Sequence, residues 1–167
     1  MINMIEKIDR ACSVAFTGHR SIPSGEVDRV SKRVDQSVRI MAAAGVKNFI
    51  SGMALGFDML AAEQIVRLKK EGYKIRLIAV VPFRGQHERW KMKDRDRYNE
   101  LMKEADDVIV LSETYFSSCF FKRNDFMLSH SCSVIAYYNG LPKGKGGTFY
   151  TIRRARMLKM NIINVYA

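Results

Sequence analysis

The sequence predicts an α/β protein with a doubly wound, mostly parallel sheet of about six strands and helices on both faces. Short apolar runs alternate along the chain with longer segments of helical period, and several of the runs are nearly continuous in Val and Ile. No long Pro/Gly/Ser linker or internal repeat interrupts this alternation. A length of 167 residues suits one core, so we expect residues 1–167 to form a single domain.

Six apolar runs are the expected strands, because short continuous runs are typical of strands that are buried on both faces of a parallel sheet. They cover residues 12–17, 48–51, 75–81, 108–111, 133–138 and 162–166. Strands in strict alternation with helices predict βαβ crossovers and therefore a Rossmann-like sheet.

Five helices are expected between these strands. In the first, Val27, Val30, Val34, Val38 and Met41 recur at steps of three and four and form an amphipathic stripe. Ser24 is its expected N-cap and Gly45 its expected end. The other helices are expected at about 56–71, 87–105, within 116–131, and 148–159, with Trp90, Leu101 and Met102 directed into the core.

The composition is typical of a soluble globular protein, with 47% hydrophobic and 27% charged residues, and the cysteines favour a reducing cytosol. No apolar run approaches the roughly 18–20 residues needed to span a bilayer, and we expect no signal peptide, because Glu6 and Asp9 interrupt the start of the chain. Cys12, Cys119 and Cys132 are odd in number and lack CxxC spacing, and two of them lie in or directly before expected strands. We therefore expect no disulfide framework, and no motif calls for a metal or cofactor.

The net charge of +11 leaves two kinds of partner open. Basic residues are dispersed in pairs such as Lys32-Arg33, Lys69-Lys70 and Arg153-Arg154. This dispersal favours a generally basic surface with one anion site over a dedicated nucleic-acid track.

Three loops that follow expected strands carry chemistry suited to an anion. They are Thr17-Gly18-His19-Arg20, the segment from Ser51 to Asp58 with Gly52 and Gly56, and the segment from Gly144 to Thr148 with Gly146 and Gly147. Glycine lets a backbone approach a ligand closely, and the free N–H groups of a following helix attract a phosphate. Neither Gly-rich loop matches GxGxxG or the P-loop pattern, so the dinucleotide and Walker interpretations fail.

Individual side chains near these loops have alternative roles. His19 either contacts a phosphate or only orders its loop, and Arg20 either holds a phosphate or pairs with Asp58 or Glu63. Asp58 is equally suited to pocket chemistry and to favouring the helix dipole. Trp90 is more often a core residue than a stacking platform.

The segment after the third expected strand, residues 82–86, is a candidate wall of the pocket, with Phe83 as a stacking side chain. The aromatic stretch 115–121 fits a lid, a dimer contact or a buried helix flank. Within it Cys119 stands near Lys122 and Arg123 but lacks a paired base, which speaks against a nucleophilic role.

The motifs TGHR (17–20), SGMALGFDMLAAE (51–63), PFRGQHERW (82–90), KRNDFM (122–127) and GKGGTFYTIRRA (144–155) resemble the YpsA-like family of the SLOG superfamily. Relatives of that family include the LOG phosphoribohydrolases and the DNA-processing protein DprA. The resemblance implies a Rossmann-like domain that binds a nucleotide or nucleotide-derived ligand. By motif, it assigns to the pocket Gly18, His19, Arg20, Ser51, Gly52, Gly56, Asp58, Arg123, Asn124, Gly146, Gly147 and Thr148.

Two departures weaken the phosphoribohydrolase interpretation. LOG enzymes resemble PGGxGTxxE, whereas this chain has Thr151 at the place of the Glu, and it has Cys132 where those relatives usually carry Asp. The favoured function is therefore a sensor or regulatory domain for a nucleotide-derived phosphate ligand. A hydrolase with Asp58 or Glu63 as general acid or base, and a single-stranded nucleic-acid binding module, remain open. Homodimers are compatible with the resemblance.

Overall fold

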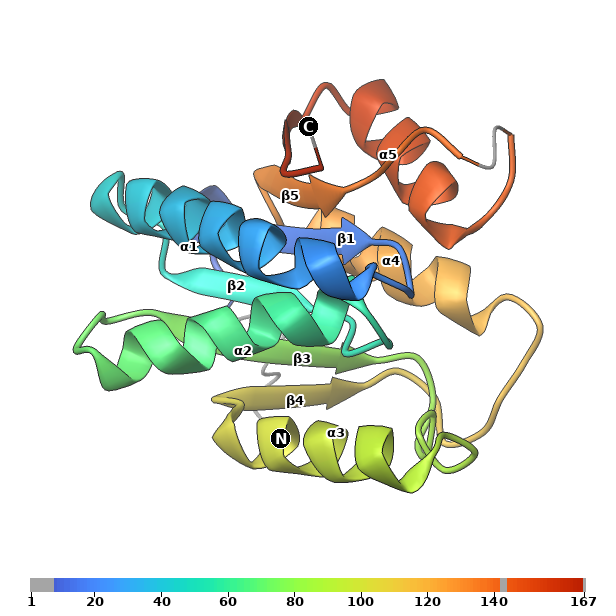
Figure 1. The fold of residues 1–167 in the computed structure, drawn as a ribbon. Coiled ribbons are helices and arrows are strands. Elements are labelled where there is room, and N and C mark those ends of the chain that lie inside the picture. Colours follow the sequence, from blue (N-terminus) through green and yellow to red (C-terminus); the bar gives the residue numbers. More distant parts are fainter. Residues whose placement is uncertain (1–7, 142–143, 167) are drawn as a thin grey trace.

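The protein forms one six-stranded parallel sheet with helices on both faces (Figure 1). A computed structural model describes residues 8–141 and 144–166. The strands are β1 (Ser13–Gly18), β2 (Asn48–Ser51), β3 (Arg76–Val81), β4 (Asp107–Val110), β5 (Ser133–Tyr137) and β6 (Asn161–Asn164). Their order is β4-β3-β2-β1-β5-β6, and all five pairings are parallel, so the predicted fold class is confirmed.

The helices divide between the two faces of the sheet. They are α1 (Val27–Ala43), α2 (Phe57–Lys70), α3 (Met92–Glu104), α4 (Cys119–Ser129) and α5 (Gly147–Met157). Figure 1 shows α1, α2 and α3 on the near face, and α4 behind the sheet. α4 and α5 pack on each other and cover the second face.

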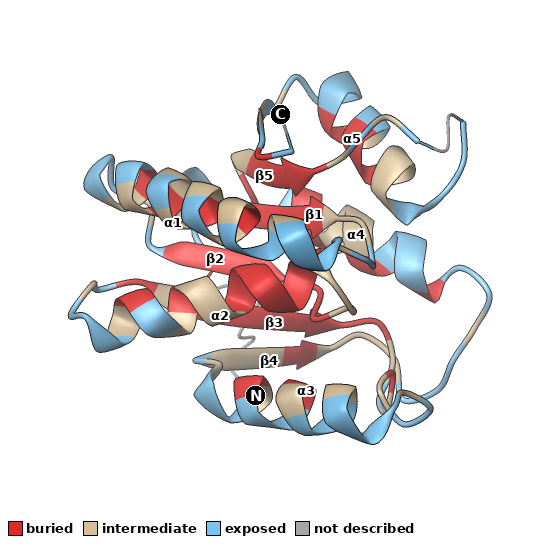
Figure 2. Ribbon diagram, viewed as in Figure 1, coloured by how far each residue is buried: buried red, intermediate tan, exposed pale blue. Residues whose placement is uncertain are grey.

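Both faces of the central strands are buried, as their apolar sequences require (Figure 2). In β1, Val14 and Phe16 join the larger core beneath α1–α3, whereas Ala15 faces the opposite side. On that opposite side Met127 of α4 joins the core under the middle strands, and Ile152 of α5 packs over β5. The alternation follows from the period of two in a strand.

Helix starts are where the structure differs most from the sequence-based expectation. The segment Ser24–Glu26 is a short 3₁₀ helix, α1 begins only at Val27, and no side chain caps it. Residues after β3 form turns instead of the first part of α3, with Gly85 at φ +82° and a hydrogen bond from Trp90 N to His87 O. A left-handed glycine and consecutive turns interrupt the helical pattern there, so α3 begins five residues later than expected.

The strand order places a topological switch point between β1 and β5. From β1 the chain builds the sheet outwards through β2 and β3 to β4, and it then returns to place β5 on the other side of β1. In such sheets the loops at the carboxyl ends of these two central strands diverge to opposite faces and leave a crevice. The three loops singled out in the sequence follow β1, β2 and β5 at this edge. No helix within residues 8–141 and 144–166 is long and apolar enough to cross a membrane.

Candidate functional site

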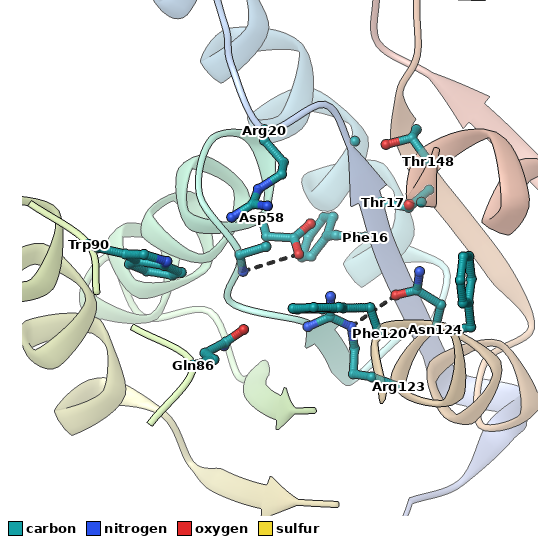
Figure 3. Close-up of a pocket in the computed structure, with 14 residues that line it drawn as sticks. Phe16, Thr17, Arg20, Asp58, Gln86, Trp90, Phe120, Arg123, Asn124 and Thr148 are labelled. Atoms are coloured by element: carbon teal, nitrogen blue, oxygen red, sulfur yellow. Dashed lines mark hydrogen bonds between the residues drawn. The ribbon is translucent and has the colours of Figure 1, made fainter. Parts of the chain in front are cut away.

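A cavity of about 290 Å³ lies at this switch point, outside the carboxyl ends of the strands (Figure 3). Its walls come from the loops after β1, β2 and β3, from α4, and from the first turn of α5. The lining residues are Phe16, Thr17, Gly18, Arg20, Ala54, Asp58, Gln86, Trp90, Phe120, Phe121, Arg123, Asn124, Gly147 and Thr148. The structure thus brings together residues from all three loops that the sequence indicated.

The first loop is held tightly against α2. A Cβ at Gly18 would lie 2.5 Å from the ring of Phe57, so only glycine fits at the end of β1. A Cβ at Gly56, which has φ +82°, would lie 2.4 Å from the carbonyl oxygen of Arg20. The backbone N–H of Phe57 donates to the carbonyl of His19 at 3.1 Å. These contacts fix the position from which Arg20 reaches the cavity.

His19 itself is not among the residues that line the cavity. Its Nε2 accepts a hydrogen bond of 2.9 Å from the backbone N–H of Asn139, and its ring packs near those of Tyr137 and Tyr138. Partial burial lowers the pKa of His19 below its ordinary value. In this structure His19 therefore links the loop after β5 to the loop after β1 by a hydrogen bond. Direct contact of His19 with a ligand stays a prediction.

The loop after β2 places Asp58 inside the cavity. The Ser51 hydroxyl accepts from the backbone N–H of Met53 and donates to the carbonyl of Asp58, each at 3.1 Å. Met53 is fully buried at φ +56°, an uncommon conformation for a residue other than glycine. Ser51, Gly52 and Gly56 therefore shape the loop without lining the cavity themselves.

Asp58 is a buried carboxyl group with one hydrogen bond, accepted by Oδ2 from the backbone N–H of Ala54 at 3.3 Å. Burial raises the pKa of Asp58 to about 6, against the opposing effects of Arg123, the Ala54 N–H and Arg20. Arg20 and Arg123 lie on either side of this carboxyl group (Figure 3). The group can therefore change charge near neutral pH.

Arg123 is the buried cation of the site, with 5% of its surface exposed. Its Nη1 donates to the carbonyl of Gly52 at 2.7 Å, and its Nε donates to Oδ1 of Asn124 at 2.9 Å. Its guanidinium lies 5.9 Å from the ring centroid of Phe120. Burial lowers the pKa of Arg123. Among the described residues, no carboxylate forms an ion pair with Arg123 or with Arg20, so the cavity has an excess of positive charge.

The start of α5 supplies the remaining polar wall. Gly147 and Thr148, the first two residues of α5, line the cavity beside Asn124, and the first N–H groups of a helix have no partners within it. Gly146 stands just before the helix at φ +97° and does not line the cavity. Thr151, at the place of the LOG glutamate, is buried and donates to the carbonyl of Gly147 at 2.9 Å.

Aromatic side chains form the rest of the wall. Trp90 packs partly against the core, as expected, but it also lines the cavity, with its ring 5.4 Å from that of Tyr98. Phe120 and Phe121 line the cavity and are 38% and 42% exposed. The lid interpretation of the stretch 115–121 fits these contacts, whereas Phe83 packs on Tyr115 and Phe120 outside the lining.

Several other candidates lie away from the cavity. Glu63 forms an ion pair with Arg97 on the surface. Cys119 is buried in the first turn of α4. Cys132 precedes β5 and Cys12 lies in a 3₁₀ helix before β1, so both stand at the amino-terminal edge of the sheet and not within strands. A comparison of Cys132 with the Asp of LOG relatives therefore says nothing about this pocket. No three His, Cys, Asp or Glu side chains of residues 8–141 and 144–166 gather closely enough to hold a metal ion.

The chain matches the family model YpsA, described as the YspA SLOG family, over residues 15–165. The chain belongs to this SLOG family. The resemblance drawn from the five motifs is confirmed.

Among curated relatives of this SLOG protein, a UPF0398 protein of Brevibacillus brevis is 33% identical over 100 residues. That match covers 56% of this chain and 53% of the relative, so the chain spans about half of that protein. DNA processing protein A from Streptococcus pneumoniae matches in fold with a TM-score of 0.61 and 19% identity, over 95% of this chain and 50% of that one. DNA processing protein A from Helicobacter pylori, for which a single-stranded DNA binding mode is described, has a TM-score of 0.64 and 18% identity, over 94% and 66% of the two chains. These two likenesses show the fold.

Proposed function

We propose that this SLOG protein binds a nucleotide or nucleotide-derived phosphate ligand in the cavity and acts as a sensor or regulatory domain. One observation carries the proposal: Arg20 and the buried Arg123 face a cavity where Asp58, the one carboxyl group among the described lining residues, has a pKa raised to about 6. Burying an unpaired cation is costly, and an anionic ligand would supply the missing partner.

The two ends of the cavity suit different parts of such a ligand. Gly147 and Thr148 offer backbone N–H groups and a hydroxyl at the start of α5, which favours a phosphate there. Trp90 stands at the opposite end in Figure 3 and offers an aromatic face for a base. A cavity of about 290 Å³ is at the small end of the range for ligand pockets, which favours one nucleotide unit over a dinucleotide.

The first test is thermal unfolding of the protein with nucleotides, nucleotide sugars and ADP-ribose. A ligand at about 100 times its Kd stabilises the folded state by roughly 2.7 kcal/mol, which raises the Tm by a few degrees. The shift should vanish in an Arg20→Ala, Thr148→Val double variant. It should persist in Arg153→Ala, which changes an exposed arginine of α5 outside the cavity. Unchanged Tm values with every compound would reject the proposal.

A hydrolase that acts on an N-glycosidic or phosphate-ester bond is the second candidate, and the raised pKa of Asp58 favours it. General acid–base catalysis works best when the pKa of the group lies near the working pH. Product analysis after incubation with nucleoside monophosphates tests this function. Turnover that is abolished in Asp58→Asn and retained in Glu63→Gln would establish it, and unchanged substrate at high protein concentration would reject it.

A single-stranded nucleic-acid binding module is the third candidate. Arg89 and Lys91 flank Trp90, and Lys122 follows the exposed Phe121. In the described part of the chain, these three cations have no ion-pair partner. Aromatic side chains among cations suit stacked bases and a phosphate backbone. Affinity for single strands should then fall by about 0.7 log units per log unit of salt for each phosphate contact. Salt-independent binding would reject this function.

A homodimer through the exposed side of the stretch 115–121 is a further part of the proposal. Tyr115 is 61% exposed there. Sedimentation of the protein and of Tyr115→Ser tests it: a dimer that dissociates in the variant supports this surface, and a monomeric parent protein rejects it.

A further inference from the structure

Asp58 differs from the other buried or half-buried carboxylates of the molecule. Asp35, Asp106 and Asp107 each form an ion pair with a basic side chain at the surface. Asp58 lies deeper, and within residues 8–141 and 144–166 no basic side chain forms an ion pair with it. Among the described residues, its carboxyl group accepts one hydrogen bond, the 3.3 Å contact with the N–H of Ala54. Few interactions therefore hold this carboxyl group in its ionised form.

The charged groups that face Asp58 come from two elements. Arg20 approaches from the loop after β1, and Arg123 approaches from α4, and both favour the carboxylate. Tyr98 of α3 and Cys119 of α4 also favour the charged form of Arg123. Asp58 therefore faces two arginines in a cavity of about 290 Å³, although in the described part of the chain it forms an ion pair with neither.

An anionic ligand would compete with Asp58 for these two arginines. A ligand held by Arg20 and Arg123 places its negative charge in the same small, poorly solvated space as the carboxylate, where like charges repel more strongly than in water. Two like charges that share a site cannot both stay ionised without cost, and the weaker acid takes up a proton. Asp58 is that acid.

We propose that binding of an anionic ligand in this cavity is coupled to the uptake of one proton by Asp58, so that the affinity for anions increases as the pH falls. The inference rests on the proposed function, because it concerns the same cavity. It goes further in assigning Asp58 a regulatory role: the carboxylate weakens anion binding at alkaline pH, and its protonation removes this opposition. In a ligand sensor, this coupling makes occupancy depend on pH as well as on ligand concentration.

Inorganic sulfate is a suitable probe, because its charge stays constant from about pH 5 to about pH 8. Trp90 is the one tryptophan of the chain and lines the cavity, so its fluorescence reports occupancy. Titrations at constant ionic strength should show a sulfate affinity that rises towards acid pH, by up to about tenfold per pH unit at the steepest point above pH 6. Calorimetry at about pH 7, in two buffers of different ionisation enthalpy, should count up to about one proton taken up per sulfate, because Asp58 is mostly ionised at this pH before binding.

Variants separate Asp58 from other titrating groups. Asp58→Asn should bind sulfate at pH 8 more tightly than the parent protein, with no pH dependence and no proton uptake. Asp125→Asn is the matched control: Asp125 accepts from Tyr150 and pairs with Arg154 outside the cavity, so the parent profile should persist. His87→Gln removes a nearby histidine outside the lining, whose pKa is lowered by burial, and should also keep the profile.

The outcomes distinguish this inference from the proposed function. Sulfate or nucleotide binding without proton uptake, or proton uptake that persists in Asp58→Asn, would overturn the role of Asp58 and leave anion binding intact. No binding of sulfate or of any nucleotide between about pH 5 and pH 8 would reject the proposed function and the coupling together. If Asp58→Asn does not fold, the proton count on the parent protein still decides between these outcomes.

Discussion

The Nη1 of Arg123 donates a hydrogen bond of 2.7 Å to the carbonyl oxygen of Gly52, which joins α4 to the loop after β2. The same carbonyl accepts from Nε2 of Gln86 at 3.2 Å. Segments that follow three different strands thus meet at one peptide group beneath the cavity. The guanidinium packs so closely that a Cβ at Gly52 would lie 2.6 Å from its Nη1.

Gly52→Ala should therefore displace Arg123 from its position. We expect a loss of about 1–3 kcal/mol in the free energy of unfolding, because the added methyl group overpacks a buried contact, together with the loss of any nucleotide-dependent shift in Tm. Gly25→Ala is the control, since a Cβ at Gly25 meets nothing within 4 Å. Urea denaturation measures both variants. Equal stability and unchanged ligand response in Gly52→Ala would contradict the role given to this contact.

The sequence indicated the sheet well because its strands are buried on both faces. All four residues of β2, Asn48–Ser51, are buried, and a run this short does not extend over a helical period. The turns between β3 and α3 were harder to recognise from the sequence. The segment that contains Gln86 and Trp90 has helical spacing, yet Gly85 adopts φ +82° and the chain turns there, which brings both side chains to the cavity wall. A period alone does not show where such a helix begins.

The sequence predicted which loops form the site, but not the side-chain contacts that hold these loops in place. The Gly-rich loops stand at strand ends, so their meeting at one sheet edge follows from the topology. Arg123 donates its hydrogen bond to Gly52, which lies 71 positions away in the sequence. Arg97 pairs with Glu63, which lies 34 positions away. The partner of each arginine depends on how the helices pack, and a single sequence does not specify this.

The stability of the protein should depend on the protonation of Asp58. Its pKa rises from 3.8 to about 6 on folding, so the folded state holds the proton more tightly than the unfolded state. The contribution of Asp58 to the free energy of unfolding should be fully present below about pH 4 and should be lost as the pH rises from about 4 to 6, by about 3 kcal/mol in all. Asp58→Asn should remove this fall and be more stable than the parent protein at pH 8. Urea denaturation of both proteins across this pH range provides the measurement, and parallel profiles would refute the assignment.

Glu63→Gln should leave ligand binding unchanged. Glu63 pairs with Arg97 at the surface, where both side chains are about 40% exposed, and neither residue lines the cavity. Exposed ion pairs contribute about 0–1 kcal/mol, so we expect a small loss of stability and no change in nucleotide affinity. A pronounced loss of affinity in Glu63→Gln, with Arg97→Gln as the comparison, would show that this pair reaches the ligand.

Alanine substitutions of the two adjacent glycines at the start of α5 should have different effects, one on ligand binding and the other on stability. Gly147 is the first residue of α5 and lines the cavity, and its added Cβ would meet only Nδ2 of Asn124, at 3.9 Å. Gly147→Ala should therefore fold with undiminished stability, because alanine favours the helix. Its methyl group should keep a phosphate away from the backbone N–H groups and weaken nucleotide binding by about tenfold.

Gly146→Ala is the opposite case. Gly146 has φ +97°, which strains any residue with a Cβ, but it does not line the cavity. We expect Gly146→Ala to lose about 1–2 kcal/mol of stability. Thermal unfolding with and without a nucleotide measures both properties in each variant. If Gly147→Ala binds as tightly as the parent protein, the phosphate does not lie at the start of α5, and the ligand is held by Arg20 and Arg123 alone.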